Sequence, residues 1–232
     1  MRKVVVFFFF LTLFSSSLLL SQIKSAKVSA TQSKDTADLG KGNAKGRFGI
    51  GVITNYAQFS KSQFSGGIRY GADLWLRVTK NFAIELEGLI SKGKSAGDPT
   101  GLSKGKLSIT TLLIGLQGRL FADRNLVPFL KAGGGYSSNQ FSLDSAISYP
   151  WNQMGFSVDE KIKNSWVYFV AAGVDLFLGK NFVLNGDLRY SICKAKASWT
   201  IKDQISNQSV TQDINNINLN SFGIGLGLRF LF

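Results

Sequence analysis

The last twelve residues, "SFGIGLGLRFLF" (221–232), decide the fold class. From Phe222 onward every second residue is large and apolar, and the positions between hold three glycines, Arg229 and Leu231. Successive side chains of a β-strand point to opposite faces of the sheet. The stretch therefore predicts a strand with one apolar face. Its other face carries three glycines, which have no side chain, followed by a charged arginine.

The same alternation recurs from residue 46 to the end of the chain, in eight runs of at least 12 residues. A strand in a soluble protein averages about 5–6 residues, whereas a tilted strand needs about 9–11 residues to cross a bilayer. Short connections (79–81, 122–126 and 179–181) alternate with longer ones near 58–65, 95–104, 143–163 and 202–215. This pattern predicts an all-β fold over 46–232, a transmembrane antiparallel eight-stranded up-and-down β-barrel. The runs are 46–57, 66–78, 82–94, 105–121, 127–142, 164–178, 182–201 and 216–232.

The N-terminal segment has the features of an export signal. Two basic residues, Arg2 and Lys3, precede an apolar stretch over 4–20, and "VSA" at 28–30 offers a small-residue cleavage site. We expect a secretory signal peptide at 1–30, with an approximate cleavage site, and an uncleaved membrane anchor is the alternative. Residues 31–45 are polar and are expected to form a flexible periplasmic lead-in. An even strand number places both mature termini at the short-turn end, which predicts two periplasmic termini in the outer membrane of a Gram-negative bacterium.

Aromatic residues on the apolar face sort by height along the predicted strands. Five tyrosines fall near the long-loop end and five phenylalanines near the short-turn end. Phe48 and Tyr56 are eight residues apart, which at a rise of about 3.3 Å and a tilt of about 40° is roughly 20 Å along the barrel axis. We expect these residues to form two aromatic girdles in outer-membrane lipid. They are Phe48, Tyr56, Tyr70, Phe82, Tyr136, Tyr168, Phe182, Tyr190, Phe230 and Phe232.

The opposite face carries charges of both signs. Eight strands leave a lumen with room for little more than side chains, so these charges are expected to pair across it as a plug in the lower lumen. The alternative is the solvated outer face of a soluble barrel. The expected plug residues are Arg47, Arg69, Asp73, Arg77, Glu85, Glu87, Arg119, Lys131, Asp175, Asp187, Arg189 and Arg229.

Composition argues against most enzymes. The chain has no histidine, which removes the usual general base and the commonest metal ligand, and its single cysteine, Cys193, forms no intrachain disulfide. We predict no catalytic residues, no metal site, no cofactor and no enzymatic activity. The formal charge of +13 points to anionic lipid headgroups as partners, not to nucleic acid, because an exported chain rarely meets nucleic acid.

Three segments resemble the OmpW family of outer-membrane proteins. They are "LWLRVTKNFAIELEG" (74–88), "VPFLKAGGGYSSNQF" (127–141) and "NSWVYFVAAGVDLFLGKNFVLNGDLRYS" (164–191). The terminal Phe232 resembles the aromatic end that the outer-membrane assembly machinery reads. The resemblance implies an eight-stranded barrel that helps small hydrophobic molecules cross the outer membrane.

Inward positions toward the long-loop end are mainly apolar, and two interpretations remain open. In the first they form the solute pocket of a narrow channel or carrier for small hydrophobic molecules, and strand glycines such as Gly133 and Gly225 thin the wall. In the second they only pack a plugged structural or adhesive barrel, whose glycines relieve crowding and whose extracellular loops bind a partner. The expected pocket residues are Ile53, Leu89, Val167, Phe169, Trp199 and Leu219.

Overall fold

The computed structural model describes residues 47–60, 64–95 and 103–232. All of them belong to one compact unit, Gly42–Phe232. The predicted signal peptide (1–30) and lead-in (31–45) lie outside the described residues.

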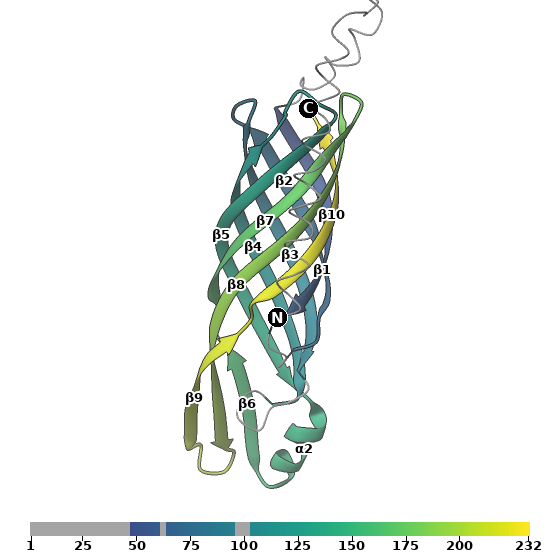
Figure 1. The fold of residues 1–232 in the computed structure, drawn as a ribbon. Coiled ribbons are helices and arrows are strands. Elements are labelled where there is room, and N and C mark those ends of the chain that lie inside the picture. The colour runs from purple at the N-terminus through teal and green to yellow at the C-terminus, as the bar shows by residue number, and fades with distance from the viewer. Residues whose placement is uncertain (1–46, 61–63, 96–102) are drawn as a thin grey trace, which may run out of the picture. The chain divides into compact units, whose positions relative to one another are not determined.

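Eight antiparallel strands close into a barrel (Figure 1). Each strand pairs with its neighbour in the chain order of the barrel, and the last one, β10, pairs with both β8 and β1. The predicted fold class is therefore confirmed. The barrel strands are β1 (Phe48–Phe59), β2 (Gly67–Arg77), β3 (Phe82–Ser95), β4 (Gly105–Arg119), β5 (Leu126–Leu143), β7 (Ser165–Leu178), β8 (Phe182–Asp203) and β10 (Ser221–Leu231).

The strands are staggered around the barrel. Gly49 of β1 pairs with a residue of β2, and following the paired residues from strand to strand once around the barrel leads back to β1 at Phe59. Phe59 lies ten residues beyond Gly49, so the stagger is ten residues. A closed sheet with such a stagger has strands tilted by about 40° and an interior that side chains fill. Residues far apart in the sequence therefore meet in the lumen.

A three-stranded sheet extends past the barrel at the loop end. The long strand β8 pairs there with β6 (Phe156–Ile162) and β9 (Ser209–Asn218), which lead into β7 and β10 (Figure 1). We call this three-stranded extension the finger. It corrects the prediction of loops at 143–163 and 202–215, and of one uninterrupted run over 216–232. Strands β6 and β9 form because β8 offers hydrogen-bonding partners on both edges, which the short stretches themselves do not reveal.

A short helix, α2 (Ser145–Gln153), connects β5 to β6. The Asp144 carboxylate caps its N-terminus by accepting a hydrogen bond of 3.1 Å from the Ala146 N–H, which satisfies one of the free backbone donors. Pro150 lies inside the helix.

In the described part of the chain, no helix has the length and apolar character needed to cross a membrane.

The barrel strands turn odd-numbered residues inward and even-numbered residues outward. The outer surface is apolar, and all ten residues expected in the aromatic girdles lie on it, exposed. At the turn end the rings of Phe48, Phe182, Phe230 and Phe232 form a continuous series, with centroids 4.9–6.0 Å apart. Trp166, which is not among the ten predicted girdle residues, also points outward and is 65% exposed. A broad apolar outer surface with aromatic residues at both ends fits a lipid environment.

Candidate functional site

The lumen of the barrel has three layers. The layer at the loop end is apolar and continues onto the finger, and we call it the upper cluster. A polar network fills the middle, and a second apolar layer, the lower cluster, closes the turn end. The upper cluster consists of Phe59, Phe64, Leu89, Leu107, Ile109, Leu113, Ile162, Val167, Phe169, Ala171, Cys193, Ala195, Ala197, Ile217 and Leu219, with Ile53, Phe141 and Ile214 packed against it.

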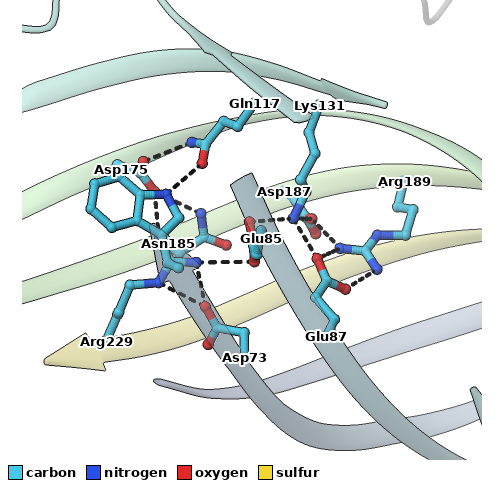
Figure 2. A network of polar contacts seen from close by, with 11 residues as sticks. Asp73, Glu85, Glu87, Gln117, Lys131, Asp175, Asn185, Asp187, Arg189 and Arg229 are labelled. Atoms are coloured by element: carbon cyan, nitrogen blue, oxygen red, sulfur yellow. Dashed lines mark hydrogen bonds and ion pairs between the residues drawn. The ribbon is translucent and has the colours of Figure 1, made fainter. Parts of the chain in front are cut away.

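One half of the network is centred on Arg229 of β10 (Figure 2). Its guanidinium contacts the carboxylate of Asp73 on β2 at 2.5 Å and that of Glu85 on β3 at 3.0 Å. Nearby, the Gln117 side chain accepts a hydrogen bond from the Trp75 indole N–H at 2.9 Å and donates one to Asp175 at 2.9 Å. These bonds join strands from opposite sides of the lumen.

The other half is centred on Lys131 of β5 and Arg189 of β8 (Figure 2). The Lys131 ammonium lies 2.6 Å from Glu87, 3.1 Å from Glu85 and 3.8 Å from Asp187. Arg189 donates two hydrogen bonds to Glu87, at 2.5 and 2.8 Å, and one to Asp187 at 3.0 Å. The two-pronged contact with Glu87 has the fork geometry that gives arginine–carboxylate pairs their specificity. Glu85 contacts both Lys131 and Arg229 and so links the two halves.

Carboxylates outnumber cations in this network. Five acids (Asp73, Glu85, Glu87, Asp175 and Asp187) face three bases (Lys131, Arg189 and Arg229), and all eight side chains are buried. Burying charges is costly unless each is paired and hydrogen-bonded, so the network acts as one unit. An apolar solute that crossed this layer would separate these pairs. Among the described residues, no group of acidic or cysteine side chains is arranged to hold a metal ion.

Glycines make room for the network. A Cβ atom on Gly51 would overlap the Asp73 carboxylate, and one on Gly225 would overlap the Asp187 carboxylate. At Gly133 the overlap would be with the backbone of the neighbouring strand. These positions favour the second interpretation of the glycines, in which they relieve crowding inside a narrow barrel.

The lower cluster consists of Trp75, Ala83, Val127, Phe177, Val183 and Leu231. The Arg119 guanidinium lies between two of its rings, 5.4 Å from the centroid of Trp75 and 5.3 Å from that of Phe177, and donates to the Lys80 carbonyl at 3.3 Å. The alternation of the sequence predicted only charged residues in the lower lumen. The charged layer instead lies between two apolar layers. The inward positions of Trp75 and Phe177 in their strands were the signal that could have predicted the lower cluster.

Eight of the twelve expected plug residues meet in the network, and four do not. Arg119 lies in the lower cluster, Arg47 is exposed and Arg77 is half-buried. Arg69 lies at the level of the upper cluster, where its guanidinium is 5.6 Å from the centroid of Phe59 and donates to the Ser221 hydroxyl at 2.8 Å. Arg69 is separated from the lower residues because inward residues of one strand differ in height. Gln117 and Asn185, which were not expected, complete the network.

Five of the six expected pocket residues belong to the upper cluster or pack against it, and Trp199 does not. Trp199 lies on the finger, eight residues beyond Ser191, the last residue of β8 paired with β10. There its ring packs edge-on against Trp151 of α2 at a centroid distance of 6.3 Å. The expected position is wrong for Trp199 because β8 leaves the barrel before reaching it.

The upper lumen is nearly filled. A cavity of about 30 Å³ lies among Phe59, Arg69, Leu89 and Cys193, and one of about 10 Å³ lies between Ile53 and the network. Cavities of this size hold about one water molecule, whereas ligand pockets measure about 300–1,000 Å³. A solute would therefore need to displace side chains of the upper cluster.

Comparisons with known proteins agree on the fold. The family model described as the outer membrane protein beta-barrel domain matches residues 19–230. The outer membrane protein OprG from Pseudomonas aeruginosa is 15% identical, with 84% of this chain and 99% of that chain covered and a TM-score of 0.59. The outer membrane protein AlkL, solved in DMPC lipid bilayers, is 16% identical, with coverages of 82% and 92% and a TM-score of 0.50. The outer membrane protein W of E. coli is 16% identical, with coverages of 81% and 98% and a TM-score of 0.41. The search of curated proteins gave no match.

Proposed function

This chain belongs to the outer-membrane protein β-barrel domain family, and from that premise we propose that it carries small hydrophobic molecules across the outer membrane of a Gram-negative bacterium. A solute enters at the loop end, rests among the side chains of the upper cluster and leaves sideways between strands into the bilayer. The barrel performs no catalysis in this proposal.

The observation that carries the proposal is the order of the layers. Apolar side chains such as Leu89 and Phe169 form the surface that a hydrophobic solute would meet first. Directly beneath them lie Glu87, Lys131 and Arg189, whose mutual pairing fills the lumen. Desolvated ion pairs resist separation by an apolar molecule. Lateral release above the network is therefore the less costly route.

An entrance is available at one side of the finger. The ladder between β5 and β7 ends at Ser137 and Ser165, although β5 continues to Leu143. Beyond that point β5 faces β6, and no ladder joins these two strands within the described residues. Phe141 and Ile162 line this seam and also contact the upper cluster. Separating the two strands there breaks no backbone ladder. It breaks the hydrogen bonds that Asn139 of β5 donates to the Lys163 carbonyl at 2.9 Å and to the Asn164 side chain at 3.0 Å.

The proposed orientation follows from the same premise. The turn end and both mature termini face the periplasm, and the finger faces outward. Residues 1–30 direct export, and residues 31–45 form the lead-in. The outer-membrane assembly machinery reads the terminal Phe232, whose ring is 61% exposed on the outer surface.

The proposal is tested by uptake of an uncharged hydrophobic dye, 1-N-phenylnaphthylamine, into cells of a Gram-negative host. Expression of the wild-type chain should raise the rate of uptake several-fold. Leu89→Arg and Phe169→Arg should return it to background, because a charge in the upper cluster repels the solute. Val183→Ala is the matched control, since Val183 is an equally buried apolar residue below the network. Unchanged uptake by both arginine variants would refute the proposal.

Two further measurements make this test decisive. Heat-dependent gel mobility checks that each variant folds as a barrel, and Leu89→Asn replaces Leu89→Arg if the latter does not fold. Planar-bilayer conductance of the refolded chain should show no current steps, because the network seals the lumen. Reproducible steps that a hydrophobic amine blocks would instead mean a continuous channel and would exclude sideways release as the route.

A second candidate is a plugged adhesive barrel whose finger binds a partner. The nearly filled lumen favours it, as do two apolar residues at the tip of the finger, Ile205 and Val210, which are 88% and 73% exposed. Under this alternative Ile205→Ser with Val210→Ser would abolish cell attachment, and the uptake of dye would equal that of cells without the chain.

A further inference from the structure

Exposed lysines lie on two opposite sides of the barrel just beyond the tyrosines of the loop end. Ile90 of β3 pairs with Tyr70, and Lys92 is the next outward residue of β3. On the other side of the barrel Ile192 of β8 pairs with Tyr168, and Lys194 is the next outward residue of β8. One outward step of two residues is about 5 Å along the axis of a barrel tilted by about 40°. Six lysines form this belt: Lys92, Lys94, Lys106, Lys163, Lys194 and Lys196.

The lysines of the belt stand next to one another. Lys94 of β3 is paired directly with Lys106 of β4. On the opposite side the Lys163 N–H donates to the Lys196 carbonyl at 2.7 Å, so these two residues are also cross-strand neighbours. Like charges directly opposite each other destabilise a sheet. A nearby anion therefore stabilises each pair, and Asp213 supplies one for Lys163.

The described acids near this level contact other lysines or only one lysine of the belt. Asp213 contacts Lys163 at 3.6 Å, Asp144 contacts Lys104 at 3.7 Å and Asp159 contacts Lys161 at 3.1 Å. None of the described acids forms an ion pair with Lys94 or Lys106. Most acids of the barrel point inward, in the network. The belt thus adjoins the lipid-facing surface and presents paired positive charges outward.

We propose that the lysine belt binds the phosphate groups of a bisphosphorylated glycolipid of the lipid A type in the leaflet at the loop end. Two features favour this lipid over a glycerophospholipid with one phosphate. The lysines occur in cross-strand pairs, which match two phosphates on one headgroup. They also occupy two successive outward positions beyond the tyrosines, Lys92 and Lys94 on β3 and Lys194 and Lys196 on β8. This spread along the barrel axis suits a headgroup that is thick along the membrane normal. The inference concerns the outer surface and holds whichever solute the lumen accepts.

Trp166 provides a probe for this site. It is exposed on the outer surface of β7, and it precedes Val167, which pairs with Cys193 of β8. Lys194 follows Cys193, so Trp166 and Lys194 lie at the same level on adjacent strands. Brominated phosphatidylcholine should quench Trp166 fluorescence, and a lipid that binds beside Lys194 should displace it and restore the signal. The Trp166→Phe variant identifies the contribution of this residue among the four tryptophans.

The experiment reconstitutes the full chain in brominated phosphatidylcholine vesicles with rising fractions of unbrominated lipid A or phosphatidylglycerol. Lipid A should restore Trp166 fluorescence at a mole fraction several-fold below that expected for random mixing. Phosphatidylglycerol should need a mole fraction much closer to that of random mixing. Lys194→Gln with Lys196→Gln should reduce the preference by about 25-fold, since each lysine near a charged surface contributes a factor of roughly five. Lys80→Gln with Lys180→Gln at the turn end is the matched control.

A second variant tests the opposite side of the belt. Lys94→Gln with Lys106→Gln should leave the barrel equally or more stable in neutral detergent, because the repulsion is relieved, and should reduce the stabilisation that lipid A gives the wild type, since the lysines near β8 remain. Random mixing of lipid A around the wild type would overturn the proposal. So would an equal preference for phosphatidylglycerol, or an unchanged preference in both glutamine variants.

Discussion

Arg229 shows how a single buried residue depends on its partners. The residue is 2% exposed, and its guanidinium contacts carboxylates from three other strands. Removing one member of a buried ion pair leaves an uncompensated charge, which costs about 3–5 kcal/mol. Arg229→Met should therefore lower the free energy of unfolding by about that amount, measured by urea unfolding of the refolded barrel in detergent micelles.

An exposed ion pair provides the comparison. Lys80 contacts Asp123 at 2.5 Å, and both side chains are more than 60% exposed. Exposed pairs contribute about 0–1 kcal/mol, so Lys80→Ala should change the free energy of unfolding by no more than that. Equal effects for Arg229→Met and Lys80→Ala would mean that the network is hydrated and not closed.

Gly225 is a second residue whose role is local. A methyl group there would overlap the Asp187 carboxylate and approach the Asn55 amide nitrogen to 3.1 Å. Gly225→Ala should destabilise the barrel by about 1–3 kcal/mol, because overpacking displaces a residue of the network. Gly186→Ala on the adjacent strand is the control, since its Cβ would make an ordinary 3.8 Å contact with Leu226. Urea unfolding distinguishes the two variants, and equal stability would contradict the crowding interpretation.

At the scale of elements, the helix α2 depends on the finger. Nine residues with an internal proline are too few to form a stable helix alone. Trp151 anchors it through ring contacts with Phe156 and Trp199, each with a centroid distance of 6.3 Å. Trp199→Ala should raise amide hydrogen exchange across 145–153 to the rate of an unstructured loop, and the melting of the barrel should stay the same.

The control for this prediction lies in the same helix. Tyr149 is 63% exposed, so Tyr149→Ala should leave amide exchange in α2 unchanged. If Trp199→Ala left the exchange of α2 equally slow, contacts other than the tryptophan pair would hold the helix. If it lowered the stability of the barrel, the finger and the barrel would unfold together.

At the scale of the whole molecule, closure of the barrel brings the C-terminus to β1. The Phe232 N–H donates to the Phe48 carbonyl at 2.9 Å, and the two rings are 6.0 Å apart. If assembly machinery reads Phe232, Phe232→Ala should reduce the amount of folded barrel in cells several-fold, although the purified variant still refolds in micelles. Heat-dependent gel mobility measures both quantities. An equal loss in cells and in micelles would indicate a purely structural role.

Alternation in the sequence determined the fold class. A strand turns its side chains to opposite faces with a period of two, so runs of 12 or more alternating residues, joined by short and long connections in turn, specify a membrane barrel without tertiary information. The outward direction of the girdle residues and the inward direction of the charges follow from the same period. The finger was missed because β6 and β9 are short and take their hydrogen bonds from β8.

Only the tertiary structure decided which inward residues meet. The closed barrel is staggered by ten residues, and this stagger sets the height of each side chain relative to those of other strands. It brings Arg229 to Asp73, 156 residues away, and it places Arg69 over the ring of Phe59, outside the ion pairs of the network. The alternation of a single strand contains no information about stagger, because that depends on the pairing of all eight strands around the closed sheet. The three-layered lumen is therefore a property of the closed barrel.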